Sequence, residues 1–324
     1  MGELSRREQR LAIAFYLGTS VATTAWWALL LFRPDLRPAF LGHAFSERFL
    51  WILAGPDLTS ALVMSTAMVF LLSRRHRATS ILAWLHFGAQ GYAWALSIGL
   101  AILDPAAYWG VVAMTFSAGI ALAFALRIQQ ADILWGSFKF RQAPSGPASG
   151  HWRQALRQTA AMWIIFLAVI PIGIALIELA FGWNQHWLSV GWRIGVGVCL
   201  FVLGGSLGLW AGRTMTRYGD GTPLPSASAR NLVVAGPYRL IRNPMALGGV
   251  VQGIAVGLII GSPLVMLYAF IGAVWWDVLA RPMEEQYLME TFGEAYRQFQ
   301  RAVPCWSFRT RPWTPAEVAR SVEA

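Results

Sequence analysis

The chain has 324 residues, of which 56% are hydrophobic and only 13% are charged. A soluble globular domain carries about 25% charged residues, so this composition excludes an ordinary soluble domain, a disordered chain and a long coiled coil. The net charge is +10. Because the arginines stand in short segments between apolar runs, we attribute this charge to membrane topology and expect no nucleic-acid partner.

Apolar runs of about twenty residues, the length that crosses a bilayer as a helix, recur along most of the chain. We therefore expect an all-α, polytopic membrane protein with about eight transmembrane helices. The first run is longer than the core of a signal peptide, so we expect it to be retained. The expected spans are residues 11–32, 58–72, 78–103, 106–126, 159–181, 191–212, 245–261 and 264–280.

Two local signals refine this division into spans. Gly55, Pro56 and Asp57 are expected to break the approach to the second span. The seventh and eighth spans are joined only by Ser262 and Pro263, so we expect a helical hairpin followed by a cytoplasmic amphipathic helix.

Basic and neutral connections alternate between the later spans. Arginines gather at residues 73–77, 127–157 and 213–242, whereas the connections near Asp104, at 184–186 and at 262–263 contain neither Arg nor Lys. The positive-inside rule therefore places the basic connections and both termini in the cytoplasm. The exception is the connection at residues 33–49, which this orientation places outside the cytoplasm although it is weakly basic. We expect a multi-pass protein of a bacterial inner membrane.

The composition shifts once, in a stretch rich in Pro, Gly and Ser at residues 141–150. Such a stretch is typical of a linker. We expect a four-span N-terminal region of unassigned role at residues 1–140, a linker at 141–158, a second membrane core at 159–310 and a tail at 311–324.

Glycines stand four residues apart in the sixth span, at positions 191 and 195, 204 and 208, and 208 and 212. A phosphate-binding loop would need a strand followed by a helix, so we expect these glycines to let helices approach closely in lipid. Cys199 and Cys305 lie far apart, and their spacing predicts neither a metal site nor a redox pair.

The informative polar residues are concentrated after residue 213. Arg239, Arg242 and Asn243 precede the hairpin, and Arg281, Glu284 and Glu285 follow it. Because a hairpin brings its two ends together, we expect these residues to form a polar pocket at the membrane surface. Pro244 suits the first turn of a helix. The two preceding arginines are also what the positive-inside rule alone predicts, and the two acids also suit the start of an amphipathic helix.

Three further polar residues lie within expected spans. Asp277 is near the end of the eighth span, and acids in membranes are often functional. His86 and Gln90 stand one turn apart in the third span. They either line a pocket or make hydrogen bonds between helices.

Five blocks in the C-terminal half resemble the isoprenylcysteine carboxyl methyltransferase and phospholipid N-methyltransferase group of integral membrane enzymes. The order and spacing of all five agree, over about residues 160–308, and the first four spans match no family. The blocks are residues 236–239 (Gly-Pro-Tyr-Arg), 242–244 (Arg-Asn-Pro), 284–285 (Glu-Glu), 292–296 (Phe-Gly-Glu-Ala-Tyr) and 303–304 (Val-Pro).

This resemblance implies methyl transfer from S-adenosyl-L-methionine to a small hydrophobic or lipid-like acceptor bearing a thiol, carboxylate or amine. The cofactor pocket would lie between the loop before the hairpin, the hairpin and the helix after it. Glu285 would meet the cofactor's amino or ribose groups and Arg281 would lie near the acceptor, which makes these two the candidate catalytic residues. The candidate cofactor-binding residues are Gly236, Pro237, Tyr238, Arg242, Asn243, Pro244, Glu284 and Glu285.

The chain departs from this family at two positions. The family usually has His where this chain has Asn243, and often Tyr where it has Ala246. An amide still donates and accepts hydrogen bonds but does not act as a base, so the resemblance implies an acceptor that is already nucleophilic. The small side chain of Ala246 would either widen the acceptor pocket or mark a divergent function.

Two alternatives remain. Membrane sterol and enoyl reductases have a similar C-terminal half and use NADPH, but the acids Glu284 and Glu285 would repel its phosphates. The second alternative is a protein that catalyses no reaction, either a transporter or an accessory membrane protein. Transporters tend to place charges near the bilayer midplane, whereas nearly all charges of this chain are predicted at one face.

Overall fold

The structure is a computed structural model that describes residues 4–43, 47–74, 78–129, 140–183 and 190–314. Its elements are helices, which confirms the predicted all-α fold. The chain forms two compact units. Unit 1 comprises residues 1–131 and 176–185, and unit 2 comprises residues 132–175 and 186–324.

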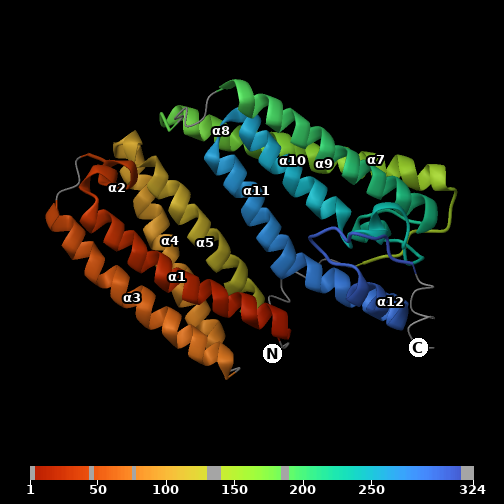
Figure 1. Ribbon diagram of the computed structural model, residues 1–324, viewed down its shortest axis with the longest axis horizontal. Helices are drawn as coiled ribbons and strands as arrows, with labels where there is room; N and C mark the ends of the chain where they lie inside the picture. Colours follow the sequence, from red (N-terminus) through yellow and green to blue (C-terminus); the bar gives the residue numbers. More distant parts are fainter. Residues whose placement is uncertain (1–3, 44–46, 75–77, 130–139, 184–189, 315–324) are drawn as a thin grey trace. The chain divides into compact units, whose positions relative to one another are not determined.

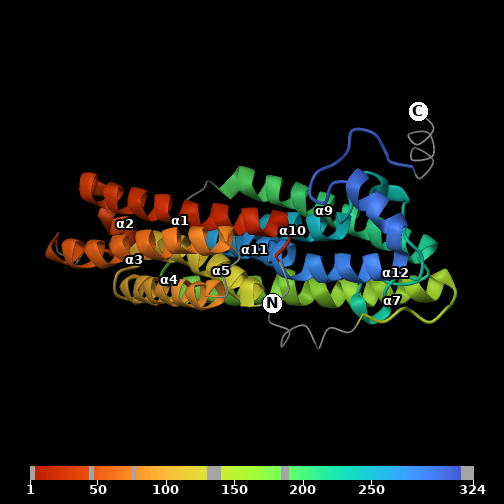
Figure 2. The ribbon, with the colours of Figure 1, turned by 90° about the horizontal axis from the view of Figure 1, so that it is seen from below.

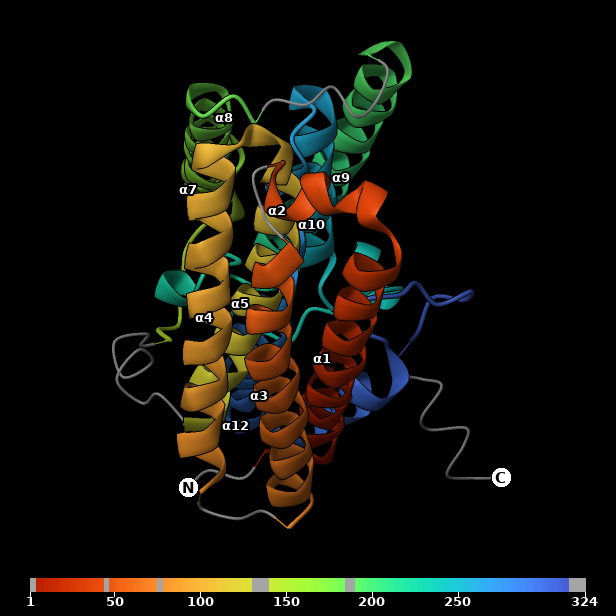
Figure 3. The same ribbon diagram turned by 90° about the vertical axis from the view of Figure 1, so that its left-hand side faces the viewer.

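Unit 1 is built on four long helices that lie side by side, α1 (Arg6–Phe32), α3 (Glu47–Ser73), α4 (Thr79–Leu103) and α5 (Tyr108–Gln129), with the short α2 (Arg37–Leu41) at one end (Figure 3). The first helix begins in a capping box formed by Ser5 and Glu8. Glu8 also accepts two hydrogen bonds of 3.0 Å from Arg127. This buried ion pair therefore ties the start of α1 to the end of α5.

Helix α3 runs through Pro56 without interruption, so the break expected at residues 55–57 is absent. A proline removes one main-chain hydrogen bond and strains the preceding turn. Packing offsets this cost, because Leu50 and Ala54 of α3 are buried against Trp27 and Leu30 of α1. In an apolar environment an unwound segment would also leave more main-chain groups without partners than the helix does.

Unit 2 contains the predicted hairpin. Helix α10 (Pro244–Ile260) turns at Gly261, whose φ of 83° lies in the left-handed region, and α11 (Pro263–Trp275) follows directly. The Ser262 hydroxyl accepts a 3.0 Å hydrogen bond from the Val265 N–H and caps α11. The predicted amphipathic helix, α12 (Arg281–Ala302), continues from α11 through the π-helical residues 276–280 (Figures 1 and 2). It is kinked at Gly293, whose φ of 55° is not helical.

Two further helical segments complete unit 2. Helix α9 (Val190–Tyr218) lies against α10, and α7 (Ala148–Trp163) leads through the π-helical residues 164–169 into α8 (Ile170–Ala180), which ends in unit 1. Helix α7 includes residues 148–158 of the expected linker. The predicted division into regions otherwise stays a prediction.

Glycines set the contact between α9 and α10. A Cβ atom on Gly204 would lie 2.7 Å from the Gly248 carbonyl oxygen, and one on Gly248 would lie 2.6 Å from the Gly204 carbonyl oxygen. The predicted role in helix packing therefore holds for Gly204. Gly208 also lies at this contact, because a Cβ on Gly248 would be 3.3 Å from Gly208 N, whereas a Cβ on Gly191 or Gly195 would meet no atom within 4 Å.

Six helices within the described residues are long and apolar enough to cross a membrane, so the chain is a multi-pass membrane protein, but the predicted number of eight is not confirmed. All eight predicted spans are helical. Helix α4 is not among the six, and α10 has only 17 residues. The six are Arg6–Phe32, Phe49–Ser73, Pro105–Gln129, Ala148–Ala180, Val190–Tyr218 and Pro263–Ala302.

Parts of the connections used to predict the orientation lie outside the described residues. These are residues 75–77, 130–139 and 184–186. The predicted orientation therefore stays a prediction.

Candidate functional site

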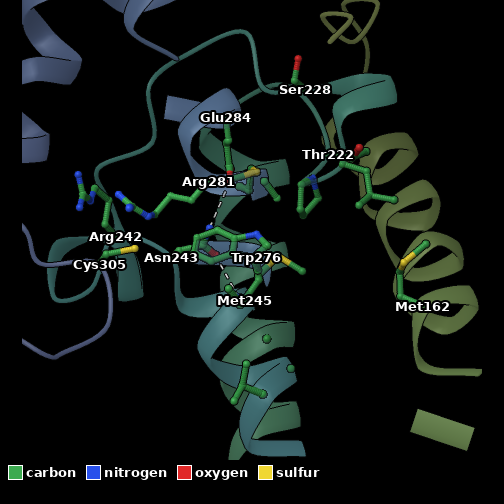
Figure 4. A pocket seen from close by; sticks show the side chains of 18 of the residues that line it. Met162, Thr222, Ser228, Arg242, Asn243, Met245, Trp276, Arg281, Glu284 and Cys305 are labelled. Atoms are coloured by element: carbon green, nitrogen blue, oxygen red, sulfur yellow. Dashed lines mark hydrogen bonds between the residues drawn. The ribbon is translucent and has the colours of Figure 1, made fainter. Parts of the chain in front are cut away.

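Unit 2 encloses a cavity of about 990 Å³. Its walls come from α7 and the π-helical residues that follow, the loop between α9 and α10, the hairpin and α12. Figure 4 shows Arg242 and Cys305 on one side of this space, Met162 of α7 on the opposite side, and Asn243, Trp276 and Glu284 between them. The cavity thus has a polar end at the start of α10 and an apolar end toward α7.

The start of α10 fixes the polar end. Asn243 is the N-cap residue, and its Oδ1 accepts a 3.0 Å hydrogen bond from the Ala246 N–H. Its Nδ2 points to Glu284 Oε2 at 3.4 Å, across the hairpin (Figure 4). The amide therefore uses both of its hydrogen-bonding functions, and it joins the start of α10 to α12.

A second set of contacts holds the acids of α12 in place. Arg281 donates from Nε to Asp277 Oδ1 at 2.9 Å and from Nη1 to Glu285 Oε1 at 3.1 Å. Gln300 donates to the other oxygen of Glu285 at 2.9 Å, and Trp306 donates to Asp277 at 2.7 Å. Because buried carboxylates need such partners, this network explains how Glu285 stays at the cavity wall.

Arg242 is less completely paired. Its Nη1 lies 3.3 Å from Glu285 Oε1, but Nε and Nη1, both buried, donate no hydrogen bond to the described residues. The main-chain N–H of Arg242 donates to the Pro304 carbonyl at 2.9 Å and anchors the residue. Buried donors without acceptors cost free energy. An anion that accepted hydrogen bonds from this guanidinium group would remove that cost.

Two further ionisable side chains border the polar end. Burial raises the pKa of Tyr238, and the charge of Glu284 adds to this effect. Burial also raises the pKa of the Cys305 thiol to about 11, although Arg242 and Arg281 oppose the shift. Both groups are therefore neutral at pH 7. Among the described lining residues there is no His or Lys, so Glu284 and Glu285 are the side chains there that could take a proton at neutral pH.

The apolar end is lined by large side chains. Met162, Trp163 and Phe166 contribute from α7 and the π-helical turn, and Tyr268 and Trp275 contribute from α11. Ala246 faces the cavity, at the position where the resemblance implies a wider pocket. The shape and chemistry suit a ligand with one polar end and one apolar end.

The structure brings most of the predicted site residues together, and the cavity lining separates them into two groups. Those whose side chains border the cavity are Tyr238, Arg242, Asn243, Arg281, Glu284 and Glu285, whereas Gly236, Pro237 and Pro244 are not among the lining residues. The latter shape the main chain instead. Gly236 has a φ of 52°, a conformation that favours glycine, and Pro244 opens α10.

The remaining predicted polar residues lie away from the cavity. Arg239 donates to the Trp313 carbonyl at 3.0 Å, and Asp277 is taken up by Arg281 and Trp306. Gln90 accepts a 2.7 Å hydrogen bond from Ser117 on α5, which is the interhelical bond expected in this span. His86 has no hydrogen-bond partner among the described residues.

The sequence interpretation missed the apolar wall and several polar lining residues, which are Gln158, Thr159, Thr222, Ser228, Asn231 and Gln252. Apolar side chains on α7 and α11 carry no signal that distinguishes a cavity from lipid. Gln252, however, lines the cavity and is the one polar side chain in α10. A single amide in the middle of an apolar helix is a signal that was available from the sequence.

Residues 192–295 match the family model described as phospholipid methyltransferase. Protein-S-isoprenylcysteine O-methyltransferase B of Arabidopsis thaliana is 28% identical to this chain over 128 residues, which make up 38% of this chain and 61% of that protein. The chain therefore spans about three fifths of the length of the curated relative that it matches. The predicted resemblance is confirmed, and residues 192–295 carry the sequence pattern of the phospholipid methyltransferase family.

Proposed function

We propose that this protein is an integral membrane methyltransferase that uses S-adenosyl-L-methionine and acts on a lipid-like acceptor. The observation that carries the proposal is the polar end of the cavity, where Arg242 has unused buried donors beside Glu284 and Glu285. The family match supports methyl transfer. The relative's name, which specifies an isoprenylcysteine, supports a lipid-like acceptor.

The described residues fit the cofactor. A guanidinium binds a carboxylate bidentately, which suits Arg242 to the methionine carboxylate. The acids Glu284 and Glu285 suit a cationic group. Glu285 is paired with both arginines, whereas Glu284 is contacted by the Asn243 amide, so Glu284 is the carboxyl group left to face a cationic part of the cofactor. When bound, the cofactor would supply an activated methyl group.

The protein's contribution is positioning and electrostatics. Arg281 donates hydrogen bonds to Asp277 and Glu285. These two carboxylates fix the position of its guanidinium group at the cavity wall and balance its charge. Asn243 holds Glu284 and the start of α10 in register. No His or Lys lines the cavity within the described residues, and Glu285 is engaged by Arg281 and Gln300. We therefore expect an acceptor atom that is already nucleophilic, as a thiolate, amine or carboxylate.

The same arrangement disfavours the NADPH-dependent reductase. Arg281 is engaged by Asp277 and Glu285, so Arg242 is the one guanidinium with donors left at the polar end within the described residues, and no Lys lines the cavity there. Phosphate groups would meet Glu284 and Glu285 with little free positive charge to offset them. A non-catalytic role is disfavoured because the buried, underpaired Arg242 destabilises the fold, and a protein that binds no anion there would gain nothing that offsets this cost.

The proposal is tested by methyl transfer in lipid nanodiscs. Methyl-labelled S-adenosyl-L-methionine is supplied with octadecanethiol, octadecylamine or octadecanoate, which share a chain and differ in the acceptor atom. We expect label in the organic phase with one of the three. Glu284→Gln and Glu285→Gln should lower the transfer by about a hundredfold, as misplacement of reacting groups does. Glu290→Gln, exposed on the same helix, should leave it unchanged.

Transfer that is equal in all three variants would show that the acids of the cavity play no part. Label in none of the three acceptors, together with no binding of S-adenosylhomocysteine, would contradict the proposal. The positive-inside rule further leads us to propose that the polar end faces the cytoplasm.

A further inference from the structure

Gln252 is a buried amide without a hydrogen-bond partner. Its side chain is 1% exposed, and Nε2 donates no hydrogen bond to the described residues. It lies in the middle of α10, whose other side chains from Pro244 to Ile260 are apolar or absent. An unsatisfied buried donor costs about 1–3 kcal/mol, so its presence in this helix requires an explanation.

The neighbouring helix provides a niche for this side chain. A Cβ atom on Gly204 would lie 3.0 Å from Gln252 Cγ, and one on Gly205 would lie 3.0 Å from Gln252 Nε2. A Cβ on Gly205 would also lie 3.5 Å from the Trp163 ring. The two glycines of α9 thus leave room for the amide beside Trp163.

Gln252 lines the cavity, but its Nε2 is covered by α9 in this conformation, so a rotation of the side chain is needed to bring the donor to a ligand there. Trp163, which lies beside the amide, also lines the cavity, as do Phe166 and Leu167. Gln252 stands nine residues after Asn243, so at 1.5 Å per residue it lies roughly 13 Å from the polar end along α10. No titratable side chain of α7 or α9 lines the cavity beside it within the described residues.

We propose that Gln252 donates a hydrogen bond to an oxygen in the apolar tail of the acceptor. The acceptor is then an oxygen-bearing amphiphile, with a carbonyl, hydroxyl or ether group roughly 13 Å from its methyl-accepting end, and not a plain hydrocarbon chain. This inference rests on the proposed function. A site built to hydrogen-bond a ligand rejects an analogue that lacks the partner atom, because the buried group is then left unpaired.

The test compares the binding of two probes that differ in one oxygen. Native mass spectrometry of the full chain measures the Kd of 10-oxooctadecanoate and of octadecanoate, in the presence of S-adenosylhomocysteine. We expect the wild type to bind the keto probe about tenfold more tightly, and Gln252→Met, which keeps the length but removes the donor, to bind both equally. Gln286→Met, an exposed exchange on α12, should retain the preference.

S-adenosylhomocysteine binding separates the two ways to fail. If the wild type does not bind it, the proposed function fails. If the wild type binds it but shows no preference for the keto probe, or if the preference persists in Gln252→Met, this inference alone is overturned. Either of these last two results would mean that a water molecule or the surrounding packing, and not the ligand, satisfies the Gln252 amide. An undiminished affinity of Gln252→Met for S-adenosylhomocysteine shows that the variant is folded.

Discussion

Arg242 Nη1 and Glu285 Oε1 lie 3.3 Å apart, although one residue precedes the α10–α11 hairpin and the other follows it. The hairpin brings them together, and Arg281 shares the same carboxylate oxygen at 3.1 Å. Glu285 is therefore satisfied largely by Arg281 and Gln300. Arg242 keeps buried donors that have no acceptor among the described residues, and this asymmetry is the basis for proposing that it binds the carboxylate of the cofactor.

We expect Arg242→Gln to weaken the binding of S-adenosylhomocysteine about tenfold or more, because a hydrogen bond to a charged group contributes about 1.5–3 kcal/mol. Calorimetry in detergent measures the effect. Arg239→Gln is the matched control, since Arg239 is nearby but bonds to the Trp313 carbonyl outside the cavity. Equal losses in the two variants would mean that general positive charge, rather than the placement of Arg242, controls binding.

The close approach of α9 and α10 should not tolerate a side chain. In Gly204→Ala the new Cβ would lie 2.7 Å from the Gly248 carbonyl oxygen, and overpacking of this kind costs about 1–3 kcal/mol. We expect a lower melting temperature in detergent. Gly195→Ala, on the same helix with no atom within 4 Å, should keep or raise it. A stable Gly204→Ala would show that the two helices can separate without cost.

Arg193 stabilises the far end of the hairpin. Its Nη1 donates to the Leu258 and Ile259 carbonyls at 2.9 and 2.8 Å, where α10 ends. A cation at a helix C-terminus also complements the helix dipole. We expect Arg193→Met to destabilise the protein by about 2–4 kcal/mol, seen as a lower melting temperature. Arg217→Met, exposed at the other end of α9, should have little effect, and an equal loss in both would contradict this role.

The fold was largely predictable because a run of about twenty apolar residues in a membrane protein forms a helix. The exceptions have local causes: Pro56 is held in α3 by packing against α1, and the π-helical residues 276–280 join α11 to α12. The polar end was predictable because Arg242 and Glu285 flank a short hairpin. The apolar end was not, since nothing in the sequence says that Met162 or Trp163 faces a cavity rather than lipid. Only Gln252 carried such a signal.

The Cys305 thiol should resist alkylation. Burial raises its pKa to about 11, whereas a free thiol titrates near 8.5. The neutral form therefore dominates below pH 11, and only the thiolate reacts. In a Cys199→Ala background we expect iodoacetamide at pH 8.5 to react at least tenfold more slowly with the folded protein than with the denatured protein. Rates that are equal at this pH would show that the thiol is not shielded.

The most direct measurement of the central claim is cofactor binding to the purified protein. Calorimetry with S-adenosylhomocysteine, with NADPH as a comparison, is performed on the wild type, Glu285→Gln and Glu290→Gln. We expect binding of S-adenosylhomocysteine that is lost in Glu285→Gln and retained in Glu290→Gln, and no binding of NADPH. Binding of NADPH alone would assign the cavity to a reductase, and binding of neither compound would contradict the assignment of this cavity as a methyltransferase site.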